Sequence, residues 1–225
     1  MEFRRIENLP PDVFSIINGL KIEARRAGND VVDLGFGNPD IPSPDIAVRK
    51  LAEAAHNPRN HRYSLSRGLP KLREAIAGYY KHKWDVDLDT ELEITNTIGS
   101  KEGFSHLMWV LLDHDDAAIV PSPSYPIHIY GPLFAGADLR QVPMRFLADP
   151  DQREHFADDF MESLKTAYDV GWPKPRVLVI SFPHNPTGAI VDLAFMQRVV
   201  DFCREHDMIV VNDFAYADIG FDGHE

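Results

Sequence analysis

Four short segments of the sequence combine glycines or prolines with side chains that could do chemistry. They are residues 97–103 (TIGSKEG), 120–126 (VPSPSYP), 181–188 (SFPHNPTG) and 210–216 (VVNDFAY). Each lies at the end of an apolar run rich in β-branched residues, which is typical of a chain that turns at the end of a buried strand. In an open parallel sheet, ligands bind beyond the carboxyl ends of the strands, so we expect these segments to form one site.

The segment at residues 97–103 has the features of a phosphate site. Gly99 permits a tight turn, and Ser100 and Lys101 open a helix whose free N–H groups and positive dipole end attract anions. The glycine spacing matches neither a dinucleotide loop nor a Walker loop, so a single phosphate fits better than a nucleotide. By itself, the segment is a weak motif that fits an ordinary serine-capped helix with a solvated lysine better than a phosphate site.

The next two segments could hold a flat, oxygen-bearing aromatic ligand. Prolines fix the backbone around Tyr125, whose ring could stack on such a ligand, although a structural tyrosine is an equal alternative. Asn185 carries both a donor and an acceptor, and it is held between a strand and Pro186. That arrangement suits a phenolate oxygen.

Asp213 follows an apolar run, where a carboxylate is costly unless a cation pairs with it. A protonated pyridine nitrogen would be such a cation, and the nearby anion would hold the proton on the ring. The alternative is an aspartate that caps a following helix. Taken together, the four segments favour the cofactor interpretation over the separate structural ones.

An alternation of strands and helices positions these segments. Strands are predicted at LEITNTI (92–98), AAIVP (117–121), LRQVPM (139–144), RVLVISFP (176–183) and MIVVND (208–213). Helices are predicted at residues 100–112, 127–134, 160–168 and 192–205, and further upstream at about 10–28 and 43–56. The alternation predicts an α/β fold, an α-β-α sandwich with a mostly parallel sheet.

Composition argues against several classes of function. The formal net charge of −12 opposes binding to nucleic acid. No apolar run is long enough to span a membrane and no secretory signal is evident, so a cytoplasmic protein is expected. The histidines have no metal-site spacing, and no metal is expected. The single cysteine, Cys203, lies on the apolar side of a predicted helix and is expected to be a buried, inert thiol.

The four segments resemble those of fold-type I pyridoxal-phosphate aminotransferases of class I/II, along essentially the whole chain and most closely in the alanine-forming and LL-diaminopimelate branch. The resemblance implies pyridoxal 5′-phosphate as cofactor and a fold of the transferase major-domain type. It implies that Ser100 and Lys101 bind the phosphate, Tyr125 stacks on the ring, Asp213 pairs with the pyridine nitrogen, and Asn185 and Tyr216 contact the 3-oxygen. In that family Asn185 would also bind the substrate carboxylate, and its bond to Pro186 is often cis.

The resemblance also assigns roles to the N-terminal part of the chain. Tyr63, which alone would be interpreted as structural, matches a tyrosine that reaches the cofactor phosphate of the neighbouring subunit in a homodimer. Gly37 matches a loop that lines the substrate-carboxylate pocket, although a plain turn is the alternative. The implied domains are an N-terminal arm with part of the small domain at residues 1–32 and an incomplete large domain at residues 33–225.

One essential residue of the family has no counterpart. The lysine that forms the Schiff base with the cofactor and moves the substrate proton is expected after Tyr216, beyond Glu225. Lys101 cannot replace it, because it is committed to the phosphate. The chain is therefore expected to be a fragment that holds no catalytic residue, is inactive on its own and tends to aggregate or misfold.

The implied activity is transfer of an amino group from an amino acid, such as glutamate or alanine, to a 2-oxo acid. The cofactor-binding residues do not select the bond that is broken, so a lyase or decarboxylase of the same fold type is an alternative. A non-catalytic, aminotransferase-like regulatory module is another, but it would predict an added basic helix-turn-helix segment, and none is visible in the sequence.

Overall fold

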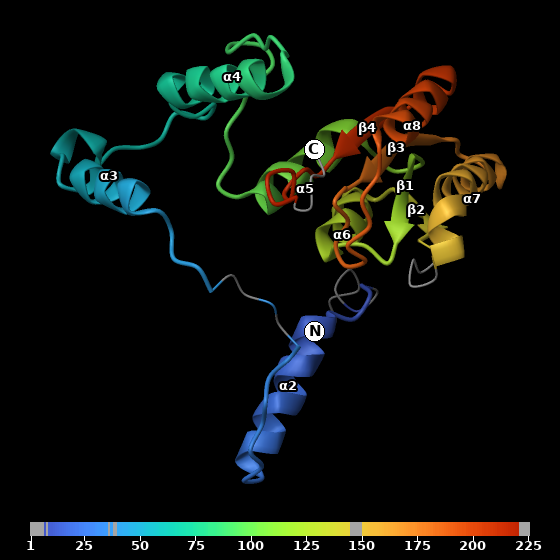
Figure 1. Cartoon of the computed structure of the whole chain (residues 1–225), viewed down its shortest axis with the longest axis horizontal. Helices are drawn as coiled ribbons and strands as arrows, with labels where there is room; N and C mark the ends of the chain where they lie inside the picture. Colours follow the sequence, from blue (N-terminus) through green and yellow to red (C-terminus); the bar gives the residue numbers. More distant parts are fainter. Residues whose placement is uncertain (1–6, 8, 36, 38–39, 145–149, 221–225) are drawn as a thin grey trace. The chain divides into compact units, whose positions relative to one another are not determined.

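The computed structural model describes residues 7, 9–35, 37, 40–144 and 150–220, with the backbone alone for 150–154 (Figure 1). Its contacts divide the chain into an N-terminal unit, Met1–Asn96, and a C-terminal unit, Thr97–Glu225. The division predicted between residues 32 and 33 concerns the functional domains of an enzyme and stays a prediction.

The described elements of the N-terminal unit are helices: α2 (Val13–Arg26), α3 (Asp45–Ala55), a 3-10 turn (Pro58–Asn60) and α4 (Pro70–Trp84). Asp12 caps α2, because its carboxylate accepts the N–H groups of Phe14 and Ser15 at 3.3 Å. The predicted helices at 10–28 and 43–56 are confirmed. Helix α4 was not predicted, although Pro70 at its start is a usual helix signal.

The C-terminal unit contains a parallel sheet. Its strands are β1 (Ala117–Ser122), β2 (Asp138–Pro143), β3 (Pro175–Ile180) and β4 (Ile209–Asn212), in the order β2-β1-β3-β4. Every pair of neighbouring strands is parallel, which confirms the predicted mostly parallel sheet. The carboxyl ends of the strands therefore lie along one edge.

The strand predicted at residues 92–98 is wrong. Asp89 accepts the N–H groups of Glu91 and Leu92 on its carboxylate, and its own N–H binds the carboxylate of Glu93 at 2.7 Å. These local bonds close a turn, and such side-chain bonds compete with a strand ladder for the backbone. Ile94 is buried, so its apolar side chain anchors a loop.

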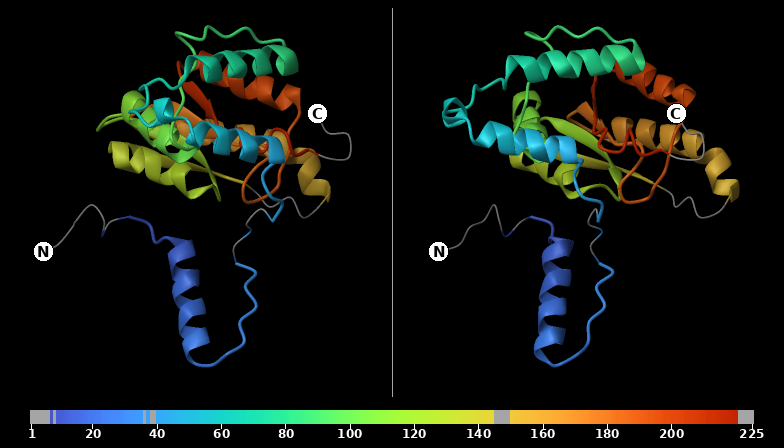
Figure 2. Two further views of the ribbon diagram at one scale, coloured as in Figure 1. Left: turned by 90° about the vertical axis from the view of Figure 1, so that its left-hand side faces the viewer. Right: turned by 60° about the vertical axis from the view of Figure 1, so that its left-hand side comes forward.

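Helices cover both faces of the sheet (Figure 1 and Figure 2). Helices α5 (Ser100–Leu111) and α6 (Pro126–Ala135) pack with the side chains of Ala118, Val120, Val177 and Val179. Helices α7 (Pro150–Asp169) and α8 (Leu193–Glu205) pack with Ile119, Leu178 and Ile180. Successive strand residues point to opposite faces, so the central strands must be apolar throughout. This is the predicted α-β-α sandwich.

Two further features bear on expectations from the sequence. Cys203 on α8 is buried, as predicted, and burial raises the pKa of its thiol to about 11, which favours the protonated form at neutral pH. In the part of the chain that the structure describes, no helix is both long enough and apolar enough to cross a membrane.

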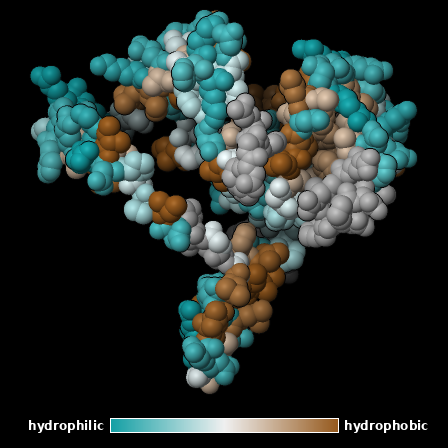
Figure 3. All heavy atoms as spheres, viewed as in Figure 1, coloured by the Kyte–Doolittle hydropathy of each residue, from teal (hydrophilic) through white to brown (hydrophobic). Residues whose placement is uncertain are grey.

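The surface of α2 is notably apolar. Figure 3 shows apolar side chains gathered along this helix, and the exposed ones include Val13, Ile16 and Leu20. Because spacings of three and four residues place them on one side, they form a continuous apolar face.

Candidate functional site

The loops that follow β1, β3 and β4 carry four of the residues predicted from the sequence: Tyr125, Asn185, Asp213 and Tyr216. The backbone N–H of Asp213 donates to the C=O of Ile180 at 2.8 Å, so the chain just beyond β4 is tied to the end of β3. Tyr125 and Asn185 follow β1 and β3 respectively. Parallel pairing thus brings side chains that are far apart in sequence to one edge of the sheet.

Asp213 is held by a buried histidine. His128, which is only 1% exposed, places Nε2 2.9 Å from a carboxylate oxygen of Asp213 and Nδ1 2.8 Å from Oγ of Ser124. A carboxylate only accepts, so Nε2 donates to Asp213; in a neutral ring Nδ1 then accepts from Ser124. The hydrogen bond from His128 lowers the pKa of Asp213, against the raising effect of burial. Asp213 is therefore an anion at neutral pH.

The alternative role of Asp213 as a helix cap is not observed. Residues 213–220 are described and form turns rather than a helix. The carboxylate side chain is still 21% exposed, so it can be reached from the loop edge.

Asn185 and Tyr216 contact each other. The Asn185 Nδ2 donates to the hydroxyl of Tyr216 at 3.1 Å, and both side chains are partly buried. The bond between Asn185 and Pro186 is cis, as the resemblance implied. Two groups that were predicted to bind one oxygen are thus neighbours.

The start of α5 lies beside Tyr125. The ammonium of Lys101 is 5.4 Å from the centre of the Tyr125 ring, within cation–π range. That ring meets the His128 ring edge-on, with centres 5.9 Å apart. Through these contacts Lys101, Tyr125, His128 and Asp213 form one continuous cluster.

The backbone at the start of α5 is arranged for an anion. Gly99 has a φ of 86°, and no side chain among the described residues caps the helix. Glu102 is engaged elsewhere, since its carboxylate accepts the N–H of Ile98 at 2.5 Å. The N–H groups of the first turn, beginning at Ser100, therefore point toward any bound anion.

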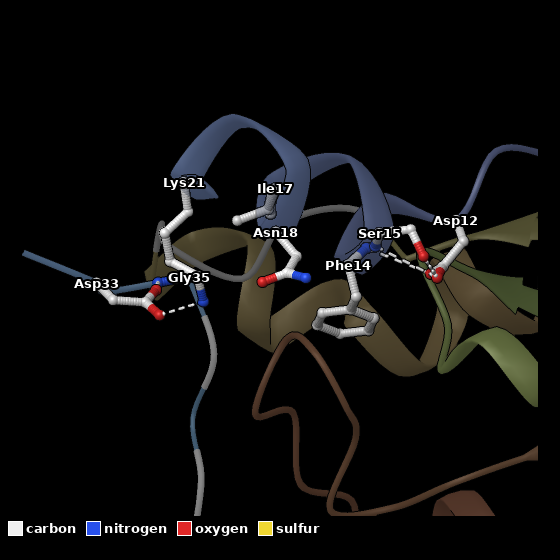
Figure 4. A pocket seen from close by; sticks show the side chains of 8 residues that line it. All are labelled: Asp12, Phe14, Ser15, Ile17, Asn18, Lys21, Asp33 and Gly35. Carbon is white, nitrogen blue, oxygen red and sulfur yellow. Dashed lines mark hydrogen bonds and ion pairs between the residues drawn. The ribbon is translucent and has the colours of Figure 1, made fainter. Parts of the chain in front are cut away.

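The two predicted residues of the N-terminal unit are exposed. Tyr63 is fully exposed, and a Cβ built on Gly37 would meet no atom within 4 Å. Their roles at the site stay predictions. This unit also has a hollow of about 420 Å³ between α2 and the segment that follows it (Figure 4). Lys21 and Asp33 line that hollow and pair with each other at 2.7 Å.

Sequence reasoning missed two buried histidines, His128 and His184. Ser124 precedes Tyr125, the cap residue of α6, and His128 lies in the first turn of that helix, so helical spacing did not reveal their contact. His184 is part of the SFPHNPTG segment, but its role is only evident from the bonds it makes within that turn.

Comparisons with known proteins agree with this geometry. The chain matches the family model described as "Aminotransferase class I and II" over residues 29–225. It is 47% identical over 221 residues to "Glutamate-pyruvate aminotransferase AlaC" of Escherichia coli (strain K12), covering 98% of this chain and 51% of that protein. It is 40% identical over 223 residues to "LL-diaminopimelate aminotransferase" of Moorella thermoacetica, covering 99% of this chain and 55% of that protein.

Solved structures give the same result. The substrate-bound BacF structure from Bacillus subtilis is 31% identical with a TM-score of 0.77, covering 96% of this chain and 52% of that one. The maleate-bound aspartate aminotransferase of Thermus thermophilus is 28% identical with a TM-score of 0.79, covering all of this chain and 56% of that one. The chain spans about half the length of the curated relatives it matches.

Proposed function

This chain belongs to the class I and II aminotransferase family, and from that premise we propose that its gene product transfers an amino group from an amino acid to a 2-oxo acid. Members of the family depend on pyridoxal phosphate. Similarity to a glutamate-pyruvate aminotransferase supports glutamate or alanine as the amino donor and pyruvate as an acceptor.

The residues present fit pyridoxal phosphate, which when bound supplies a protonated ring that stabilises negative charge on the substrate α-carbon. The observation that carries the proposal is the chain of hydrogen bonds from Ser124 through the buried His128 to Asp213. It fixes an anion at the loop edge of the sheet, where a pyridine nitrogen would need one. The uncapped start of α5 with Lys101 would hold the phosphate, and Tyr125 would cover the ring.

Each side chain then has a definite task. Asp213 stays charged and holds the proton on the ring nitrogen, while His128 orients the carboxylate and keeps its pKa low. Asn185 donates to Tyr216, so the phenol proton of Tyr216 remains available for the 3-oxygen of the cofactor.

No lysine described in the C-terminal unit is free at the site to form a Schiff base and move the substrate proton. The lysines of the C-terminal unit are Lys101, Lys165 and Lys174. Lys101 lies over Tyr125, Lys165 is exposed on α7, and Lys174 donates to the carbonyls of residues 168 and 169. We therefore expect the 225-residue polypeptide by itself not to transaminate.

We further propose a cytoplasmic homodimer in which Tyr63 reaches the partner's cofactor phosphate. The full exposure of Tyr63 and the apolar face of α2 support this arrangement. Sedimentation of the full-length gene product at dimer mass is expected, and Tyr63→Phe should weaken cofactor binding without changing that mass. A monomer that binds the cofactor fully would contradict the dimer.

The activity test uses the purified full-length gene product loaded with pyridoxal phosphate. With glutamate and pyruvate we expect stoichiometric 2-oxoglutarate and alanine, measured by chromatography. Release of ammonia or carbon dioxide in place of a new amino acid would identify a lyase or decarboxylase. Failure to transfer an amino group between any amino acid and 2-oxo acid tested would overturn the proposal.

A further inference from the structure

His184 makes several of the hydrogen bonds that close the turn containing Asn185. Its backbone N–H donates to the C=O of Ala189 at 2.8 Å, and its own C=O accepts the N–H of Gly188 at 2.7 Å. Its ring Nδ1 lies 2.8 Å from Oγ1 of Thr187. That hydroxyl oxygen also accepts the N–H of Ala189 at 3.3 Å. The backbone and the imidazole of one residue thus close the turn from both ends.

The imidazole is buried and neutral. His184 is 3% exposed, and its ring lies 5.9 Å from that of Phe182. Burial, and then the nearby His128, lower the pKa of His184 to about 4. A neutral ring has one donor nitrogen and one acceptor nitrogen. Because Thr187 accepts from Ala189, its own hydroxyl proton can be given to Nδ1, which leaves Nε2 as the donor.

Nε2 of His184 is buried without a hydrogen-bond partner among the described residues. An unpaired buried polar atom is unfavourable, so an apolar ring of similar size would suit this position better if packing were the only requirement. What the imidazole adds is the bond from Nδ1 to Thr187, which lies within the turn that presents Asn185.

We infer that His184 is a positioning residue for the proposed reaction: through Nδ1 and Thr187 it fixes the turn at residues 184–189, so that the Asn185 amide faces Tyr216. The inference rests on the proposed function for the cofactor readouts below. Its effect on the turn can be measured without cofactor.

Three substitutions of His184 distinguish the roles of its two ring nitrogens. His184→Asn keeps a polar atom at the position of Nδ1, His184→Gln keeps one at the position of Nε2, and His184→Phe keeps the ring without nitrogen. His206→Gln is the control, because His206 is another imidazole of the C-terminal unit, bonded through Nδ1 to the C=O of Phe202 at 2.9 Å, and glutamine does not replace that nitrogen. All variants are made in the full-length gene product.

The cofactor readouts are the dissociation constant of pyridoxal phosphate and its bound absorption spectrum, which reports the ionisation of the 3-oxygen. We expect His184→Phe and His184→Gln to weaken binding about tenfold, the equivalent of roughly one hydrogen bond, and to shift the spectrum. His184→Asn should restore both readouts to near wild type. His206→Gln should lower thermal stability without shifting the spectrum.

The cofactor-free readout is amide hydrogen exchange at Gly188 and Ala189. Exchange should accelerate in His184→Phe and His184→Gln, and remain slow in His184→Asn. Equal effects of all three variants, rescue by Gln alone, or unchanged exchange in His184→Phe would overturn the inference. If the wild-type protein binds no pyridoxal phosphate, the proposed function is wrong, and hydrogen exchange still decides the role of His184 in the turn.

Discussion

His128 is almost wholly buried, yet both of its ring nitrogens are bonded, one to Ser124 and the other to Asp213. A buried carboxylate without a donor would tend to take up a proton. The histidine prevents this and leaves the site with a fixed negative charge. The electrostatics of the site therefore depend on a residue that need not touch the cofactor.

Asp213→Asn removes that charge while keeping the size of the side chain. We expect kcat/KM for amino transfer by the full-length gene product to fall about 10²-fold or more, because a fixed stabilising charge is lost. Asp213→Glu, which keeps the charge, should retain more activity. Steady-state kinetics measure both variants, and wild-type rates for Asp213→Asn would contradict the role given to the carboxylate.

His184 should make stability depend on pH. Its pKa is lowered from 6.5 to about 4 in the folded state, so between these values the unfolded chain binds a proton that the folded chain does not. The free energy of unfolding is therefore unaffected by the titration of this residue above about pH 6.5. It decreases as the pH drops from 6.5 toward 4, by a total on the order of 3 kcal/mol.

Urea unfolding of the cofactor-free, full-length gene product at a series of pH values measures this effect. His184→Phe has no titrating ring, so its stability should decline less steeply over the same interval. Parallel pH profiles for wild type and variant would show that the histidine is not kept neutral by the fold.

Individual site residues could be predicted from the sequence where polar side chains follow the end of a strand. Asn185 was predicted from its position to meet a phenolate oxygen, the family resemblance added Tyr216 on the same oxygen, and the two residues are neighbours in the structure. His128 was missed because an apolar helix segment does not reveal which of its residues faces the sheet. That depends on how the helix packs, which is not encoded locally.

Helices α5 and α6 approach closely at Gly131. A Cβ at this position would lie 2.7 Å from a ring carbon of Phe104 and 3.0 Å from Cγ of Met108. Both of those side chains are buried in the core, so neither can move away freely. The helix pair therefore needs a residue without a side chain at this contact.

Gly131→Ala should destabilise the fold by about 1–2 kcal/mol, because overpacking outweighs the better helix propensity of alanine. Gly78→Ala in α4 is the matched control. A Cβ there meets nothing within 4 Å, so propensity alone should stabilise by about 0.5–1 kcal/mol. Denaturant unfolding measures both changes, and a stabilising Gly131→Ala would show that the helices can separate without penalty.

Most elements could be predicted, and the two errors have physical causes. Residues 92–98 have the composition of a strand, but the Asp89 carboxylate accepts the backbone N–H groups of Glu91 and Leu92 at the start of this segment. Helix α4 was overlooked although Leu72, Ile76, Tyr80 and Trp84 recur every four residues, because Gly78 and the polar run at 81–83 leave the helix only weakly amphipathic. The apolar pattern of a segment predicts its secondary structure only when no side chain forms hydrogen bonds with the backbone groups that the helix or strand would use.

Large apolar side chains are exposed in both units of the chain. Leu34 is 92% exposed in the N-terminal unit and Ile98 is 89% exposed in the C-terminal unit. The pattern of sheet and site residues was sufficient to predict the family. It could not predict which surface, if any, covers these side chains, because the apolar pattern of a segment does not identify what the segment packs against.

We expect the 225-residue polypeptide to self-associate in solution, since contiguous exposed apolar surface drives association. Light scattering coupled to size-exclusion chromatography should give masses well above the 25.5 kDa of one chain. Leu20→Glu, on the apolar face of α2, should reduce the association. A monodisperse monomer that melts cooperatively would contradict the expectation.

The bond between His128 and Asp213 joins residues that lie 85 positions apart in the chain. Such distant partners meet late in folding, because the entropy of closing a long loop opposes them until β4 has joined β3. On the ribosome, β1 and His128 emerge well before Asp213 is synthesised. A nascent chain thus holds the histidine without its anion, and under the proposed function a pyridine ring could be bound only when the last described strand is in place.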